Sequence, residues 1–369
     1  MERRGLSRRA STPGNPRHVT ICDRAGAGQC YQRRMAKYLL ALACCLGCGS
    51  SHGSSNGGGG GGAPSPDAAS PPDATSADAA HTTPPVDAPD QSHYRTSLSS
   101  CWTDVTCQRA LLIAHGGEWV LVDPPYGTTA AYEDAYSDDA DSIKADVRFS
   151  KDGVAVVVHS SPFQAYEIDP IDFSCEGASV EDMNVSDIVA CQWINGDHVE
   201  TLDTLLAWAK GKMIVMLTVK VDATIAQTIA AVIADGATDY AFLEVSTNAM
   251  TTIVPGAPNH DQVYYLVEAA SQADVSTLLA QADPRAFMYE DANSDNFGGM
   301  AASAVTQMID GQLHPAHVRA FSSIASVTAA ASDHEALWNE GFDVVMTNSY
   351  ATGHQGRIAV NTARGISPP

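Results

Sequence analysis

Short apolar runs alternate with helical segments from residue 94 to the end of the chain, and this alternation limits the fold more than any other feature. The pattern is typical of parallel α/β architectures, in which each buried strand is followed by a covering helix. Length and alternation favour a (β/α)₈ TIM barrel. Nine runs qualify as strands for its eight places, and the two that we doubt are residues 286–290 and 318–322. The nine are residues 111–115, 142–147, 154–159, 213–219, 240–245, 262–267, 286–290, 318–322 and 342–347.

The intervening segments predict helices over residues 129–136, 202–210, 223–234, 275–281 and 335–340. A doubly wound sheet is the rival architecture for such an alternation. That fold carries a glycine-rich nucleotide fingerprint after its first strand, and none follows residues 111–115. The barrel is therefore the favoured fold.

The N-terminal quarter of the chain predicts export and tethering. Residues 35–48 combine a positive start, a short apolar stretch and small residues before Cys48, as in a bacterial lipoprotein signal whose cysteine becomes lipidated. Cys44 is the second candidate for lipidation. Residues 1–34 are Arg-rich and read as an over-extended start. Residues 49–92, mostly Gly, Ser, Pro, Ala and Asp, predict a disordered tether, so residues 93–369 form the folded domain.

Charge narrows the range of partners. The chain has a formal charge of −22, and residues 1–48 hold nine basic and two acidic residues, which leaves −29 on residues 49–369. A body this acidic repels phosphate backbones, so we expect no nucleic-acid partner. Membrane contact is expected through the lipid anchor rather than through charge. The expected location is extracytoplasmic, on a bacterial membrane.

Four cysteines lie in the predicted domain, and an exported protein favours disulfides between them. Pairing of neighbours in sequence, Cys101 with Cys107 and Cys175 with Cys191, is our choice among three connectivities. Four buried thiols are the alternative. A zinc site is disfavoured because no pair has CxxC spacing.

Titratable side chains gather at the predicted carboxyl ends of strands, where barrel enzymes place their active sites. His115 and His159 each end a predicted strand, and two imidazoles suit acid–base chemistry near neutral pH. Lys144 and Asp146 alternate onto one face of another strand, and Lys220 follows a further one. The plain alternative is that both histidines are partly buried structural side chains.

Several segments resemble the glycerophosphodiester phosphodiesterase family, a PLC-like phosphodiesterase barrel. Residues 143–159, IKADVRFSKDGVAVVVH, are similar to the family's "IELDVRLTKDGVPVVFHD". Weaker likenesses are 112–117 to "AHRG", 125–132 to "PENTLAAF", 201–206 to "TLEEVL", 212–220 to "IEIK" and 342–348 to "VDGIITD". The resemblance implies hydrolysis of glycerophosphodiesters to glycerol 3-phosphate and an alcohol. It implies His115 and His159 as the catalytic pair, Asp146 as a metal ligand and Lys220 as the conserved lysine of its strand.

Other positions depart from the family pattern. Lys144 and Thr218 stand where the family has metal-ligand glutamates, and Gly116 stands where it has a phosphate-contacting arginine. Tyr126 replaces the glutamate of "PEN", and Ser160 replaces the aspartate after the second histidine. A Ca²⁺ or Mg²⁺ site needs several carboxylate or carbonyl oxygens, which these residues do not supply.

Three interpretations follow. In one, Lys144 and Asp146 are a structural ion pair, and the protein is an inactive member that binds ligands or acts as a scaffold. In another, the Lys144 ammonium replaces the metal and, with Lys220, binds the phosphodiester. In the third, Glu118, Glu244 or Glu290 supplies relocated ligands for Ca²⁺ or Mg²⁺. The expected ligand is a small phosphodiester, and no cofactor is firmly implied.

Overall fold

The computed structural model describes residues 93–119, 124–164, 175–193, 195–292 and 295–367. The signal segment, Cys48 and the tether lie outside these residues. Within the described part, no helix combines the length and apolarity needed to cross a bilayer.

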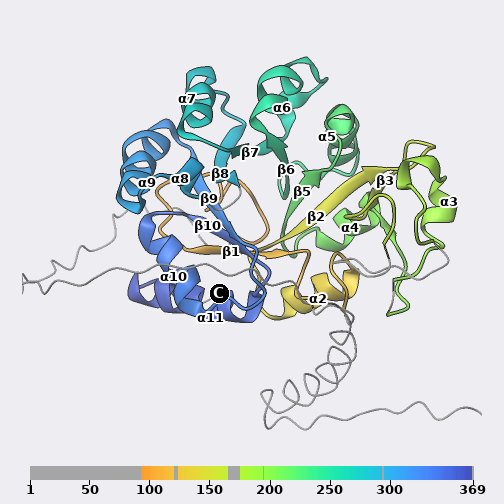
Figure 1. Ribbon diagram of the computed structural model, residues 1–369, viewed down its shortest axis with the longest axis horizontal. Coiled ribbons are helices and arrows are strands. Elements are labelled where there is room, and N and C mark those ends of the chain that lie inside the picture. Colours follow the sequence, from red (N-terminus) through yellow and green to blue (C-terminus); the bar gives the residue numbers. More distant parts are fainter. Residues whose placement is uncertain (1–92, 120–123, 165–174, 194, 293–294, 368–369) are drawn as a thin grey trace, which may run out of the picture. The chain divides into compact units, whose positions relative to one another are not determined.

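Eight parallel strands form a closed barrel with helices outside it, a (β/α)₈ TIM barrel (Figure 1). Closure comes from β1, which pairs with β2 on one side and with β10 on the other. The barrel strands are β1 (Leu111–His115), β2 (Ser142–Phe149), β5 (Ile214–Val219), β6 (Ala241–Ser246), β7 (Tyr264–Ala269), β8 (Ala286–Asp291), β9 (Arg319–Ile324) and β10 (Val344–Thr347).

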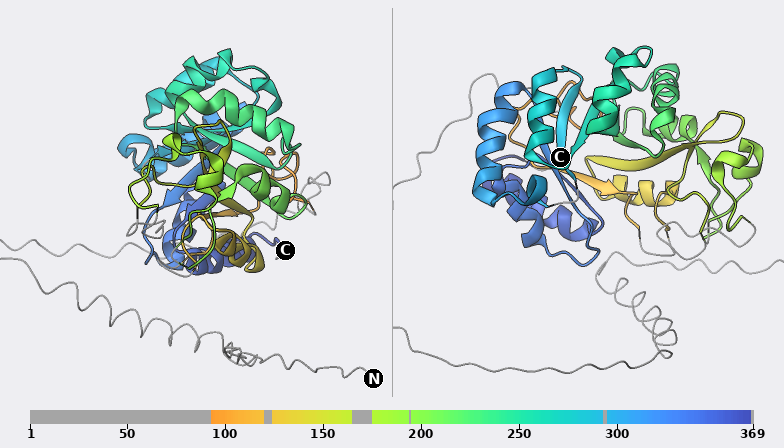
Figure 2. Two further views of the ribbon diagram at one scale, coloured as in Figure 1. Left: turned by 90° about the vertical axis from the view of Figure 1, so that its right-hand side faces the viewer. Right: turned by 45° about the horizontal axis from the view of Figure 1, so that its top comes forward.

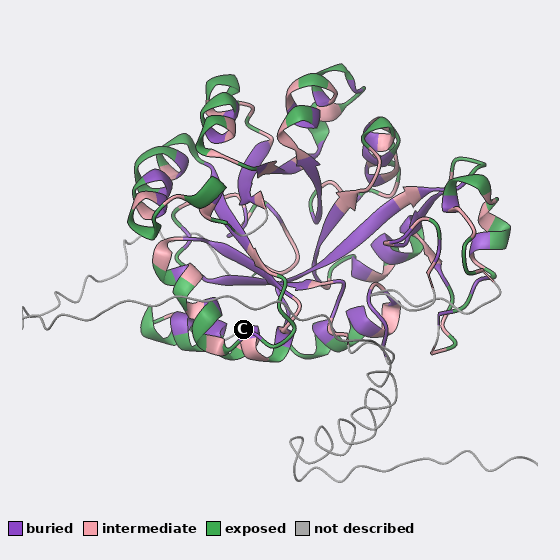
Figure 3. Cartoon of the chain, viewed as in Figure 1, coloured by how far each residue is buried: buried purple, intermediate pink, exposed green. Residues whose placement is uncertain are grey.

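The helices around the barrel bury one face on it and leave the other to solvent, whereas the barrel strands are buried almost throughout (Figure 3). This explains why the strands read as continuous apolar runs, since both of their faces are covered. The helices are α2 (Thr129–Ser137), α3 (Val185–Ile188), α4 (Leu202–Ala209), α5 (Ile225–Ala234), α6 (Thr247–Thr252), α7 (Gln272–Gln281), α8 (Asn296–Gly299), α9 (Ala302–Met308), α10 (Ala331–Glu340) and α11 (Tyr350–Ala363).

The prediction of the surplus strand was wrong. The doubted segments are β8 and β9, both full members of the barrel, and the accessory strand is β3 (Ala155–Val157). β3 runs antiparallel to β2 and to β4 (Glu200–Thr201). The physical reason is the tight turn at residues 150–154, in which the Val154 N–H donates to Ser150 Oγ, because a turn this short joins only antiparallel strands.

β2 continues past the barrel and, with β3 and β4, supports a side arm (Figures 1 and 2). We define the side arm as the described residues of 155–201. Val156, Phe163, Val180 and Trp193 belong to an apolar cluster of the arm itself. Ala155 and Val157 of β3 pack into the barrel core instead. The disulfide Cys175–Cys191 belongs to this arm.

The segment before β1 covers the amino ends of the strands. Trp102 is fully buried there and its ring contacts Phe242 of β6. The disulfide Cys101–Cys107 closes this segment, so both predicted disulfides are confirmed. The opposite end of the barrel, where the strands finish, is left for the polar side chains.

Candidate active site

His115 ends β1 and has one fixed tautomer. Asn348 donates from Nδ2 to the carbonyl oxygen of Ala325 (2.8 Å), which turns Asn348 Oδ1 toward His115 Nδ1 (2.7 Å). An amide oxygen only accepts, so His115 Nδ1 carries the proton and Nε2 keeps a lone pair. Burial and the nearby Lys144 ammonium lower the pKa of His115 to about 3. The imidazole is therefore neutral at pH 7 and suited to act as a base.

His159 reaches the same mouth by a different route. The prediction had placed it at the end of a barrel strand, but it follows the antiparallel β3, which returns toward the barrel because the Val158 N–H donates to the carbonyl oxygen of Asp146 (3.0 Å). Arg148 Nε donates to the carbonyl oxygen of His159 (2.9 Å) and fixes its backbone. The second histidine of the candidate site therefore belongs to the side arm and not to a barrel strand.

Tyr126 lies between the two histidines. Its ring makes edge contacts with His115 (5.3 Å between centroids) and with His159 (5.6 Å). A Cβ on Gly116 would lie about 2.1 Å from the Tyr126 ring, and Gly116 has φ +71°. Only glycine fits beside this tyrosine, which accounts for the loss of the arginine at position 116. In the sequence Tyr126 is only a replacement for the glutamate of "PEN", and no local signal predicts its central position.

Lys144, Asp146 and Lys220 form one buried ion cluster. Asp146 Oδ1 accepts from the Lys144 ammonium and lies 3.1 Å from Lys220 Nζ, while Oδ2 accepts from the Tyr126 hydroxyl (2.8 Å). Burial alone would raise the pKa of the Asp146 carboxyl, but the two ammoniums hold it well below its usual range. Two cations on one carboxylate leave a net positive charge beneath the histidines. We call His115, Lys144, Asp146 and Lys220 the cationic wall.

The family's metal position does not fit a divalent ion in this chain. Both Asp146 oxygens are already engaged by ammonium or hydroxyl donors. Thr218, on β5, donates its hydroxyl to Glu244 instead of facing Asp146 as a ligand. β5, which carries Thr218 and is followed by Lys220, is the third barrel strand and not the fourth, because β3 is not part of the barrel.

Three glutamates lie near the carboxyl ends of the next three strands: Glu244 on β6, Glu268 on β7 and Glu290 on β8. We call them the acidic wall. Burial and neighbouring Glu244 raise the pKa of Glu268 to about 7, and the same causes raise the pKa of Glu290 well above its ordinary value. The sequence had singled out Glu244 and Glu290 but missed Glu268, which lies one residue beyond the predicted strand.

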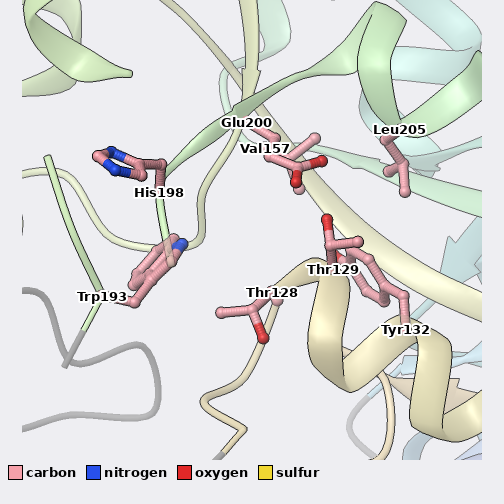
Figure 4. Close-up of a pocket in the computed structure, with 9 residues that line it drawn as sticks. Thr128, Thr129, Tyr132, Val157, Trp193, His198, Glu200 and Leu205 are labelled. Atoms are coloured by element: carbon pink, nitrogen blue, oxygen red, sulfur yellow. The ribbon is translucent and has the colours of Figure 1, made fainter. Parts of the chain in front are cut away.

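Glu118 is not part of this group. Burial and nearby Asp138 raise the pKa of Glu118 to about 8, so its carboxyl faces the end of α2 rather than the acidic wall. A small pocket also lies apart from both walls, between the start of α2 (Thr128, Thr129) and the strands β3 and β4 (Figure 4). Its histidine is His198, and neither His115 nor His159 lines it.

Comparison with known proteins agrees with this architecture. Residues 125–323 match the model of the Glycerophosphoryl diester phosphodiesterase family. A glycerophosphoryl diester phosphodiesterase from Parabacteroides distasonis is 17% identical, with 72% of this chain and 94% of that chain covered and a TM-score of 0.55. An Agrobacterium tumefaciens glycerophosphodiester phosphodiesterase is 18% identical, with 67% and 99% covered and a TM-score of 0.51.

A phosphodiesterase from Oleispira antarctica, solved in complex with the product sn-glycerol-3-phosphate, is 16% identical, with 69% of this chain and 99% of that chain covered and a TM-score of 0.51. At identities of 16–18%, the likeness to these structures supports the shared fold alone. No curated protein matches the chain.

Proposed function

The chain belongs to the glycerophosphoryl diester phosphodiesterase family, and from that premise we propose that it hydrolyses glycerophosphodiesters to glycerol 3-phosphate and an alcohol. In this proposal the ammoniums of Lys144 and Lys220 act in place of a metal ion. The observation that carries it is the cationic cluster on Asp146, next to a histidine whose free nitrogen can accept a proton.

The chemistry assigns one role to each group. His115 Nε2 removes a proton from a water molecule, whose oxygen attacks phosphorus. His159 donates a proton to the departing alkoxide as the phosphorus–oxygen bond to the alcohol breaks. The fixed positive charge stabilises the phosphoryl oxygens, where negative charge builds up in the transition state. The Oleispira relative, which holds glycerol 3-phosphate, supports a ligand of this class.

The test is turnover of several glycerophosphodiesters by the purified chain, with and without EDTA, Ca²⁺ and Mg²⁺. We expect hydrolysis that survives chelation, because the ammoniums are part of the chain, and that disappears in His115→Ala. Hydrolysis that requires a divalent ion would contradict the role given to the lysines.

A second candidate function is ligand binding or scaffolding without turnover. Tyr126 favours it, because this side chain is only 2% exposed and occupies the space between the histidines. Absence of turnover for every phosphodiester, with or without divalent ions, would support this function over hydrolysis.

The proposal also includes membrane tethering from outside the cytoplasm. It rests on the signal-like residues 35–48 and on the tether composition of residues 49–92. Metabolic labelling with a radioactive fatty acid tests it: we expect the label to be lost in Cys48→Ser and kept in Cys44→Ser. Label that persists in Cys48→Ser would place the anchor on another residue, and a wild-type chain without label would exclude the anchor.

A further inference from the structure

The acidic wall brings three carboxylates from consecutive strands to one point. Glu268 pairs with Glu290 in the register of β7 and β8, and Glu244 is near the end of β6. One ligand oxygen from each glutamate lies within 4.8 Å of those from the other two. Oxygens around one Ca²⁺ are about 2.3–2.6 Å from the ion, so they can be up to about 5 Å apart. The spacing suits a single ion.

One carboxylate oxygen of this group has no hydrogen-bond donor within the described part of the chain. Glu290 is 5% exposed, and its Oε2 is buried without a hydrogen-bond donor among the described residues. An unpaired buried carboxylate oxygen is costly, so native structures rarely keep one without a bound ion, water or proton. Glu244 is held in place from the other side, since the Thr218 hydroxyl donates to its Oε2.

Charge balance favours a dication. The two walls together contain four carboxylates, Asp146 and the three glutamates, against the two ammoniums of Lys144 and Lys220. With every group ionised, the excess is two negative charges in a largely buried space. Asp146 balances one of the two ammonium charges, and the other can offset only one of the three glutamates.

We propose that Glu244, Glu268 and Glu290 bind one divalent metal ion of the hard, oxygen-seeking class to which Ca²⁺, Mg²⁺ and Mn²⁺ belong. The ion neutralises the excess charge and gives Glu290 Oε2 a partner. This site lies on β6, β7 and β8, whereas the position implied by the family resemblance lies on β2 and β5. The inference concerns binding and holds whether or not the chain hydrolyses phosphodiesters.

Calorimetric titration of the full chain with CaCl₂, MgCl₂ and MnCl₂, at about 150 mM NaCl and without substrate, tests the site. The salt suppresses weak binding to exposed carboxylates. We expect about one equivalent of at least one ion to bind, and we expect that ion to raise the melting temperature. In Glu290→Gln, which keeps the shape but removes the charge, affinity should fall at least tenfold.

Glu118→Gln is the matched control, because Glu118 is also a partly buried glutamate of raised pKa but lies outside the cluster. It should bind the ion like the wild type. If Glu290→Gln does not fold, Glu268→Gln, whose side chain is less buried, serves as the second variant. Failure of the wild type to bind any of the three ions, or wild-type affinity in the folded glutamine variant, would overturn the proposal. Neither result depends on hydrolysis.

Discussion

The cationic and acidic walls lie at the same end of the barrel but differ in the sign of their charge and in how their carboxylates are paired. On the cationic wall each Asp146 oxygen has a donor, and the surplus is a fixed positive charge. On the acidic wall three glutamates crowd together and one oxygen has no donor among the residues that the structure describes. The difference shows that the carboxylate on β2 is neutralised by ammoniums of this chain, whereas the three carboxylates on β6, β7 and β8 have no such cations paired with them among the described residues.

The largest expected effect is on the cationic wall. His115→Ala removes the general base and should lower kcat by about 10²–10⁴-fold, the usual contribution of such a group. Steady-state hydrolysis at pH 7 measures it. His198→Ala, an exposed histidine of the side arm, is the control and should retain full activity. Equal activity in both variants would leave His115 as a structural side chain.

Lys144→Met should have the next largest effect. The substitution keeps the side chain's length but removes one of the two ammoniums, so the phosphoryl charge loses a stabilising partner. We expect kcat/KM to fall by about 10²–10³-fold, the range for a lost electrostatic contact. If Lys144→Met hydrolyses glycerophosphodiesters as fast as the wild type, Lys144 does not act in place of a metal ion. The difference in charge between the two walls would then have no part in hydrolysis.

Gly116→Ala tests the packing of Tyr126. The new Cβ would overlap the Tyr126 ring, whereas nothing lies within 4 Å of a Cβ added to Gly153, whose φ of +81° is similar. Both alanine variants share the backbone strain, so their difference isolates the overlap. We expect Gly116→Ala to lose about 1–3 kcal/mol more free energy of unfolding than Gly153→Ala. Denaturant titration measures this, and equal losses would show that Tyr126 is free to move.

The acidic wall predicts a dependence of stability on pH in the presence of EDTA. The pKa of Glu268 is about 7 in the folded chain against 4.5 as its ordinary value. The folded state therefore binds the proton more tightly, and this contribution to stability falls as the pH rises from about 4.5 to about 7. The slope is at most about 1.4 kcal/mol per pH unit. Glu268→Gln should have a flatter profile than the wild type; parallel profiles would contradict the raised pKa.

The smallest expected effect concerns the orientation of His115. In Asn348→Asp a carboxylate faces Nδ1 and favours the imidazolium, so the pKa of His115 rises from about 3. Activity that needs neutral His115 should then decline at a pH about one unit higher than in the wild type. The pH profile of kcat/KM measures the shift. Asn348→Ala, which adds no charge, should leave the position of the acid limb nearly unchanged.

Much of the barrel could be predicted from the sequence because the spacing of apolar residues, which marks buried strands and helix faces, is a local signal. The apolar runs of β8 and β9 were visible, and the doubt about them came from counting β3 as a barrel strand. The turn at residues 150–154 carried the information needed to exclude it. The family resemblance and both disulfide pairings also followed from the sequence.

The arrangement of the site was harder to predict because it depends on packing between distant segments. Their places in or after predicted strands marked His115, Lys144, Asp146 and Lys220 as candidate site residues. The distances between them depend on how the barrel closes, which the sequence does not show. Nothing in the sequence placed the Tyr126 ring between the histidines. The contact from Asn348 to His115 joins residues 233 positions apart in the chain and leaves no local signal.

The side arm has a consequence for how the site can be lost. It has its own small apolar cluster and its own disulfide, and it holds His159, whereas His115 belongs to the barrel. Regions with few shared core contacts open independently of the rest of a fold. We therefore expect partial melting of the outer part of the arm to withdraw His159 while the barrel stays folded, so that the site can be lost before the fold is.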